Sequence, residues 1–304
     1  MKLLLSNAYI AWSNAIKYHD YIYSGRATLI NQKHFVSSLH NAVELFLKQL
    51  LIINNDKDII NKFYKPASNS LKTAFNNATD LNSFFESIPC GEENSFETIN
   101  FFKLINKKMV ELLKNESEEN QSEELEELKN SLSMLNNLRN SEMHFFIKNN
   151  FLSEANFIQL HNFMIHFYEK LEDKNLLPYW GSPAPYSFYS NLLFQSETLK
   201  NFSYHDALKN NPIASKIAEI INNSNSSLSN ERIRSTDDIY EIIRTENEIN
   251  DYGFDLDEIF DICDMFLRLD CISVNKIEED FEPYYESEIG WINPQTYYFI
   301  NVNL

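Results

Sequence analysis

Glycine is scarce in this sequence, with five Gly among 304 residues against 23 Phe and 16 Tyr. A chain with so few glycines has few positions for tight turns with positive φ, which argues against a turn-rich β architecture. Hydrophobic residues make up 43% of the chain and can fill a sizeable core. We therefore predict a mainly α-helical protein, and its length predicts two domains.

Cysteines and long apolar runs are also few. Cys90, Cys263 and Cys271 lie far apart and form no C-x-x-C pair, which argues against a disulfide framework or a zinc site. Ser6 and Asn7 interrupt the leucines of the N-terminal "MKLLLSNAYIAW", and no later stretch reaches the roughly 20 apolar residues of a membrane helix. We predict a cytoplasmic protein without a membrane segment.

Positive charge is deficient, and unevenly so. The chain carries 26 Lys and Arg against 44 Asp and Glu, a net charge of -18. Residues 201–304 hold 7 of the basic and 21 of the acidic residues, a net charge of -14, which leaves -4 for residues 1–200. A strongly acidic region repels a phosphate backbone. Any nucleic-acid chemistry is therefore expected in the first part, and DNA binding by the second part is disfavoured.

The pattern of apolar residues predicts an antiparallel helical bundle over residues 1–175. An Asn-rich segment, residues 55–94, interrupts it and looks like an insertion, with short helical pieces expected near 57–64 and 80–87. The bundle helices are expected at residues 3–23, 34–53, about 96–114, from 125 onward and about 153–173, the last capped by Ser153.

Three prolines in "NLLPYWGSPAPYSFYS" break the helical pattern and predict a linker over residues 176–190. Residues 191–304 are then expected to form an acidic α+β domain, with helices at about 213–222, 236–247 and 255–269 and strands at "CISVNKI" and "TYYFINV". Three helices followed by a β-hairpin resemble a winged helix. The acidic charge favours a sensing or protein-contact role for this domain.

One buried stripe ends on an unexpected residue. Leu125, Leu128, Leu132 and Leu135 are spaced by three and four, and the next position of the stripe is Arg139. A guanidinium in place of a core leucine needs an anion or hydrogen-bond partners if it is buried. The stretch "LRNSEMHFF" is therefore the strongest candidate for a functional site.

The first domain resembles a HEPN domain, a helical family that includes RNA-cleaving toxins and phage-defence effectors. The residues "RNSEMH" at 139–144 match the family motif of Arg, a polar residue and a following His, and "LHNAVELFLKQLL" resembles an earlier helix of the family. The resemblance covers about residues 1–175. It implies a metal-independent RNA endonuclease of a bacterial toxin or phage-defence type. The alternative is a catalytically silent HEPN scaffold that binds RNA, a nucleotide or a protein partner.

The motif residues suit this chemistry. RNA can cleave itself when its 2'-hydroxyl is deprotonated beside a phosphate, and the imidazole of His144 is suited to take that proton. Arg139 would stabilise the charge that develops on phosphorus, with Asn140 orienting the phosphate. The products would be a 2',3'-cyclic phosphate and a 5'-hydroxyl. This mechanism requires neither a metal nor another cofactor.

The spacing of the motif raises a geometric difficulty. Residues five apart on a regular helix diverge by about 140°, so Arg139 and His144 do not share a face. Either the helix loosens near Ser141, or the Arg side chain wraps back, or two copies assemble the site. The resemblance favours the last and implies a homodimer through the helices that carry Arg139 and Glu44. Glu44 either supports the site by holding Arg139 or His144, or forms an i,i+4 pair with His40 or Lys48.

Regulation is expected to come from outside the motif. Some HEPN toxins are silenced by modification of a Tyr two residues after the motif His, and this chain has Phe146 there. We therefore expect the acidic C-terminal domain, or a regulatory or antitoxin protein that contacts it, to restrain the activity.

Overall fold

The computed structural model describes residues 2–64, 69–88, 91–92, 94–114, 122–143, 152–177, 184–223, 236–245, 255–278, 284–286, 290–292 and 296–304. They form two compact units, and each unit is built from two segments of the chain. The first comprises Met1–His19 and Gln32–Asn201, and the second comprises Asp20–Asn31 and Phe202–Leu304. Helices predominate in the described residues, which confirms the predicted mainly α-helical class.

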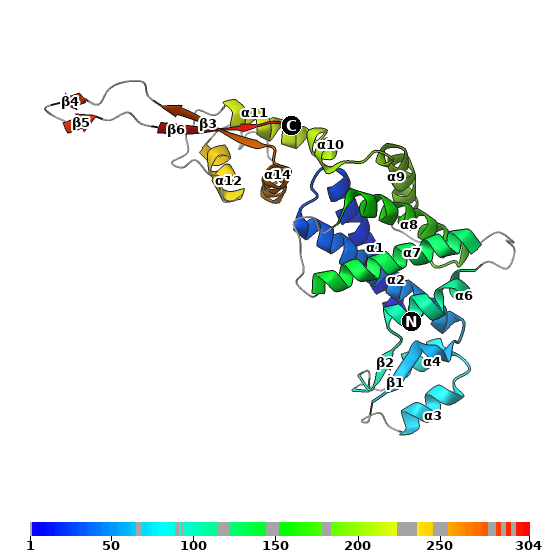
Figure 1. Cartoon of the computed structure of the whole chain (residues 1–304). Helices are drawn as coiled ribbons and strands as arrows, with labels where there is room; N and C mark the ends of the chain where they lie inside the picture. The colour runs from blue at the N-terminus through cyan, green and yellow to red at the C-terminus, as the bar shows by residue number, and fades with distance from the viewer. Residues whose placement is uncertain are drawn as a thin grey trace. The chain divides into compact units, whose positions relative to one another are not determined.

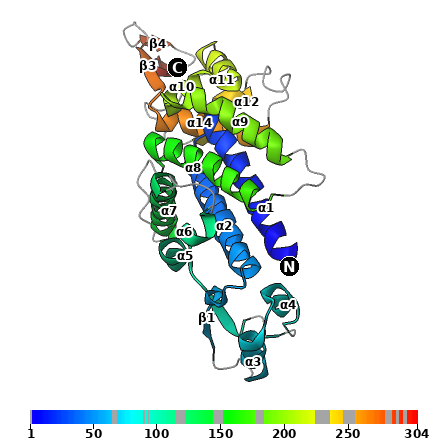
Figure 2. The same cartoon turned by 90° about the vertical axis from the view of Figure 1, so that its right-hand side faces the viewer.

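Long helices build the first unit, and they pack around an aromatic core. Helices α1, α2, α7 and α8 lie side by side in both views (Figures 1 and 2). Phe46 and Phe167 both contact Trp12, with ring centroids 6.4 and 6.1 Å from the indole. The Ser153 hydroxyl caps α8 by accepting from the backbone N–H of Asn156, as expected. The bundle helices are α1 (Lys2–Tyr23), α2 (Leu29–Ile53), α7 (Ser122–Met143), α8 (Glu154–Asp173) and α9 (Ala184–Leu199).

The segment between α2 and α7 corrects two predictions. The helix expected at 57–64 is a 3-10 turn followed by a strand, and the helix expected at about 96–114 is a strand followed by two short helices. The strands pair antiparallel with Phe63 opposite Phe96, and the Phe63 ring also contacts Phe75 at 5.6 Å. These aromatic contacts outweigh local helix propensity. The elements are η1 (Lys57–Ile59), β1 (Ile60–Phe63), α3 (Asn69–Asn77), α4 (Leu81–Glu86), β2 (Phe96–Thr98), α5 (Phe101–Lys107) and α6 (Met109–Leu113).

The predicted linker over 176–190 needs correction as well. Its last part belongs to α9, which begins at Ala184 and remains in the first unit. Tyr189 explains the packing, since its ring stacks on Tyr168 at 4.6 Å and its hydroxyl donates to Glu169 at 2.6 Å. The boundary between the units falls instead between Asn201 and Phe202.

The second unit contains the predicted helices and strands of the C-terminal region. Strand β3 pairs antiparallel with β6 from Ile272 opposite Val302 to Glu278 opposite Thr296, and β4 pairs with β5 in the segment that connects them. Helix α11 packs against β6. The elements are α10 (Tyr204–Lys209), α11 (Pro212–Asn223), α12 (Thr236–Thr245), α14 (Leu256–Arg268), β3 (Ile272–Glu278), β4 (Tyr284–Glu286), β5 (Gly290–Ile292) and β6 (Thr296–Val302).

The turn between α1 and α2 also belongs to the second unit. Gly25 has a φ of 89°, and a Cβ atom there would lie 2.7 Å from the Ala207 carbonyl oxygen, so the position requires glycine. Arg26 is buried and donates to Asp261 from Nε and Nη2 at 3.0 and 2.8 Å. Asn31 donates to the same carboxylate at 3.1 Å. The ion pair between Arg26 and Asp261 therefore binds this turn to α14 within the second unit.

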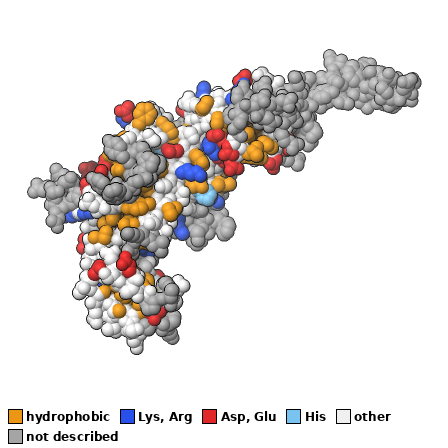
Figure 3. All heavy atoms as spheres, turned by 180° about the vertical axis from the view of Figure 1, so that it is seen from behind, with side chains coloured by type: hydrophobic (Ala, Val, Ile, Leu, Met, Phe, Trp, Pro, Cys, Tyr) orange, Lys and Arg blue, Asp and Glu red, His pale blue; other side chains and the backbone are white. Residues whose placement is uncertain are grey.

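Helix α2 is long and apolar enough to cross a membrane by length and composition alone, and it is the one such helix in the described part of the chain. Within its most apolar stretch, 61% is buried inside the protein, as in a core helix. On the face shown in Figure 3, basic side chains lie in small groups among acidic and apolar ones.

Candidate functional site

The stripe on α7 is buried as predicted, and it leads to Arg139. Leu125, Leu128, Leu132 and Leu135 are all nearly inaccessible to solvent. Arg139 follows near the C-terminal end of the helix and is half-buried, whereas Asn140 is exposed. His144, the expected base, and Phe146 lie outside the described residues.

Glu44 lies on the polar face of α2 and is engaged by its own helix. Its carboxylate accepts from Lys48 Nζ at 2.6 Å, and its other oxygen lies 3.9 Å from His40 Nδ1. Lys48 Nζ also donates to the Thr98 hydroxyl at 2.9 Å. Of the two roles considered for Glu44, the structure therefore contains the i,i+4 pair, although both partners are half-buried rather than fully exposed.

His40 connects this face of α2 with α7. The imidazole is 6% exposed, and its centroid lies 3.8 Å from that of the Phe101 ring. Burial lowers the pKa of His40 from its ordinary value of 6.5 to about 4; the Glu44 carboxylate raises this pKa, and the Arg139 guanidinium lowers it. His40 is therefore neutral at physiological pH. Two of the predicted site residues, Glu44 and Arg139, come close enough to act on the same ring.

Arg139 has an unusual environment for a half-buried guanidinium. Among the described residues, no carboxylate lies within 4.0 Å of it and no hydrogen-bond partner is present. The nearest acidic group on α2, that of Glu44, is already paired with Lys48. A guanidinium can bind a phosphate through two parallel N–H···O bonds.

A second histidine cluster in the same unit was not predicted. His19 Nε2 lies 3.0 Å from His161 Nδ1, and His161 Nε2 lies 2.9 Å from the Ser196 hydroxyl. Both rings are fully buried, with His19 stacked on Phe157 at 4.9 Å. Burial and, to a smaller extent, the neighbouring His19 lower the pKa of His161 to about 3. The two imidazoles bond to one another and are inaccessible to solvent, so the cluster is structural.

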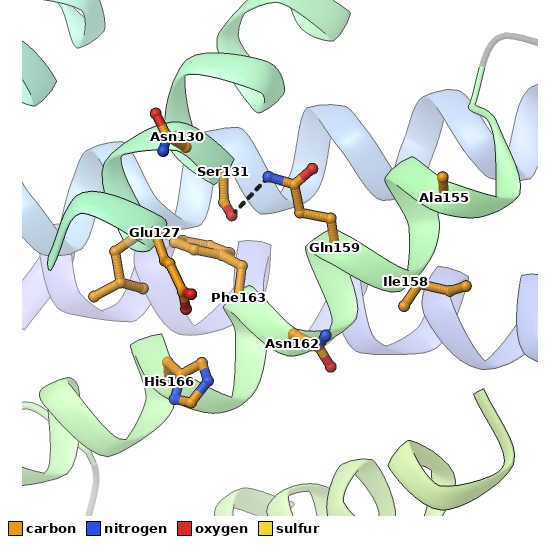
Figure 4. Close-up of a pocket in the computed structure, with 10 residues that line it drawn as sticks. Glu127, Asn130, Ser131, Ala155, Ile158, Gln159, Asn162, Phe163 and His166 are labelled. Atoms are coloured by element: carbon orange, nitrogen blue, oxygen red, sulfur yellow. Dashed lines mark hydrogen bonds between the residues drawn. The ribbon is translucent and has the colours of Figure 1, made fainter. Parts of the chain in front are cut away.

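Two pockets were also missed by sequence reasoning. A pocket of about 410 Å³ lies between α7 and α8, where Gln159 and Ser131 point toward one another and share a hydrogen bond of 3.2 Å (Figure 4). A groove of about 460 Å³ lies between α1 and α2. The signal in the sequence was the recurrence of Asn and Ser at helical spacing, which does not distinguish a solvated face from a groove.

The described residues contain no group of three or more His, Cys, Asp or Glu side chains placed to hold a metal ion. The chain matches no known protein-family model, no curated protein and no solved structure. The chemistry of the α2 and α7 side chains is therefore the basis for assigning a function.

Proposed function

We propose that this protein is a metal-independent RNA endonuclease of a bacterial toxin or phage-defence type, with a HEPN-like first domain. Its site would lie where the end of α7 meets the polar face of α2. The catalytic residues would be Arg139, Asn140 and His144, with Glu44 in a supporting role. We further propose a cytoplasmic homodimer, restrained through its acidic second unit.

Arg139 carries the proposal. It continues a stripe of buried leucines, yet among the described residues it has no acidic partner. A structural arginine in such a position normally pairs with a carboxylate, as Arg26 does with Asp261 in the second unit. A guanidinium that lacks such a partner and lies near a neutral imidazole favours an incoming anion.

In the proposed reaction His144 removes the proton of a ribose 2'-hydroxyl. The 2'-oxygen then forms a bond to phosphorus while the bond from phosphorus to the 5'-oxygen breaks, and the leaving oxygen takes a proton from solvent. Arg139 and Asn140 hold the phosphate oxygens as negative charge gathers on them. Placement of this chemistry in the first unit agrees with the charges, because the second unit carries most of the net charge of -18.

The test is cleavage of single-stranded RNA in EDTA by the wild-type protein and by His144→Ala. The expected result is cleavage that leaves 2',3'-cyclic phosphate ends, lost by about 10² to 10⁴ in rate in the variant. His166→Ala is the matched control, since His166 is a half-exposed histidine paired with Glu169 at 3.4 Å on α8. RNA bound but left intact by the wild type would favour the silent scaffold, and cleavage that depends on added Mg²⁺ or Zn²⁺ would contradict the mechanism.

A further inference from the structure

The groove between α1 and α2 has a lining without a single charged side chain. From α1 it is lined by Asn7, Ile10, Ala11 and Asn14, and from α2 by Ser37, Ser38, Asn41 and Leu45. In a chain with a net charge of -18, a groove lined without a carboxylate is a surface on which a polyanion meets no repulsion from the lining residues.

The amides of this groove are available for a ligand. Asn7, Asn14 and Asn41 are exposed and have no hydrogen-bond partner among the described residues. Each offers two N–H donors and one carbonyl acceptor, the groups that read the edges of nucleobases and a ribose hydroxyl. Between them lies Ile10, with 61% of its surface exposed, an apolar patch on which the face of a base can pack.

The groove is continuous with the proposed site along α2. On a helix with 3.6 residues per turn, Ser37, Asn41, Glu44 and Lys48 fall within about 60° of one another. The first two line the groove, whereas the last two form the ion pair beside His40. A strand held with its phosphate at Arg139 can therefore extend over the outer face of α2 toward α1.

The pocket between α7 and α8 offers a contrast of similar size. It also contains amides, those of Asn130, Gln159 and Asn162, but Glu127 and His166 line it as well (Figure 4). The Glu127 carboxylate repels a phosphate backbone, and Gln159 is already bonded to Ser131. This pocket therefore serves as an internal control for the groove.

We propose that the groove between α1 and α2 binds an unpaired ribonucleotide next to the phosphate that is cut, with Asn7, Asn14 and Asn41 contacting the base edge and the ribose 2'-hydroxyl. This inference rests on the proposed ribonuclease function and adds the subsite that gives it a preference for single-stranded RNA.

The experiment compares the triple variant Asn7→Ala, Asn14→Ala, Asn41→Ala with the control variant Asn130→Ala, Asn162→Ala. Binding of a labelled 12-nucleotide single-stranded RNA, and of DNA of the same sequence, is measured in the His144→Ala background, and cleavage sites are mapped with His144 intact. Loss of several hydrogen bonds predicts about tenfold or more weaker RNA binding and an altered pattern of cleavage sites in the triple variant. The control variant should bind within about twofold of its parent, because its amides lie outside the proposed track.

The two proposals fail in different ways. A wild-type protein that leaves RNA intact, together with a triple variant that loses RNA binding, would remove the ribonuclease function and retain the groove as an RNA site. Unchanged binding and an unchanged cleavage pattern in a triple variant with the wild-type melting temperature would overturn the groove. A triple variant that keeps its RNA affinity but changes from dimer to monomer by light scattering would also overturn it, since a second copy would then be the occupant.

Discussion

Two histidines in the first unit are buried to a similar extent but have opposite surroundings. His161 bonds to His19 on one side and to Ser196 on the other, and aromatic rings enclose the pair. His40 has no hydrogen-bond partner at Nε2 among the described residues, and the groups that act on its pKa come from two helices, with Glu44 and Lys48 on α2 and Asn136 and Arg139 on α7. Burial lowers the pKa of both rings, to about 3 and about 4.

The comparison shows that a shifted pKa does not by itself identify a site. In both clusters the largest cause of the shift is loss of contact with water. The two clusters differ in whether the polar groups around the imidazole have partners. Both ring nitrogens of His161 have a hydrogen-bond partner, whereas His40 Nε2 has none and the nearby Arg139 guanidinium has no carboxylate within 4.0 Å among the described residues. An incomplete set of partners, rather than burial, is what points to a ligand.

The largest effect is expected for the rate of RNA cleavage in Arg139→Lys, and it distinguishes an Arg139 that binds an anion from one with a structural role. Arg139→Lys keeps the charge but loses the planar fork that binds two phosphate oxygens, so we expect RNA cleavage to fall by about 10² or more. The melting temperature should remain near the parent value, because no acidic partner among the described residues is left unpaired. A variant that melts far below the parent and cuts in proportion to its folded fraction would make "LRNSEMHFF" structural.

The sequence predicted helices α7 and α8 well because their signal is local. The leucine stripe of α7 and the Ser153 cap of α8 each depend on residues within a few positions of one another. The assembly of the second unit from two distant segments of the chain was not predictable in this way. Arg26 and Asp261 are 235 positions apart, and neither residue's surroundings mark it as one half of a buried pair.

The candidate site was also predictable only in part: the sequence singled out two of its residues but not the burial of His40. Arg139 stood out because it interrupts an apolar period, and Glu44 because it lies on a polar stripe. His40 was noted only as a member of that stripe. Its burial depends on Phe101, a residue 61 positions later whose ring contacts it, and no periodicity within α2 reveals that contact.

Acid should lower the free energy of unfolding more through protonation of His161 than through protonation of His40. A histidine whose pKa is lowered in the folded state binds its proton more readily when unfolded, so its contribution to stability is complete above about pH 6.5 and is lost as the pH falls toward the folded pKa. For His161 that loss extends down to about pH 3 and amounts to roughly 3 to 5 kcal/mol of unfolding free energy. For His40 it ends near pH 4 and is smaller.

The measurement is chemical denaturation of the wild type, His161→Phe and His40→Phe between pH 7 and pH 3. The stability difference between the wild type and each variant should change with a similar slope from pH 6.5 to about pH 4, and below pH 4 only the difference for His161→Phe should continue to change. Equal slopes in all three proteins would mean that neither imidazole is buried in solution.

At neutral pH, His161→Phe and His40→Phe should change the free energy of unfolding by smaller amounts. His161→Phe removes two hydrogen bonds and leaves Ser196 and His19 without that partner, which should reduce the unfolding free energy by about 1 to 3 kcal/mol. His40→Phe removes a nitrogen that lacks a partner and should change it by less than about 1 kcal/mol. Thermal and urea unfolding of both variants test this order, and a reversed order would contradict the distinction between the two clusters.

The smallest expected effect on stability concerns Glu44, and it decides which role that residue has. The ion pair between Glu44 and Lys48 is an i,i+4 contact, so Glu44→Gln should change the unfolding free energy by only about 0.3 to 0.5 kcal/mol. The substitution also removes the negative charge beside Lys48, which makes the face of α2 near Arg139 more positive while Lys48 keeps its bond to Thr98. RNA should then bind about two- to fivefold more tightly at low salt, with a steeper dependence on salt concentration.

Glu219→Gln is the matched control, because Glu219 pairs with Lys216 at 3.0 Å in the second unit, far along the chain from the proposed site. It should leave both RNA affinity and its salt dependence unchanged. For Glu44→Gln, cleavage should stay within about threefold of the parent if Glu44 only holds Lys48. A fall of tenfold or more, with stability preserved, would instead mean that Glu44 positions Arg139 or His144, and the ion pair with Lys48 would then be secondary to that role.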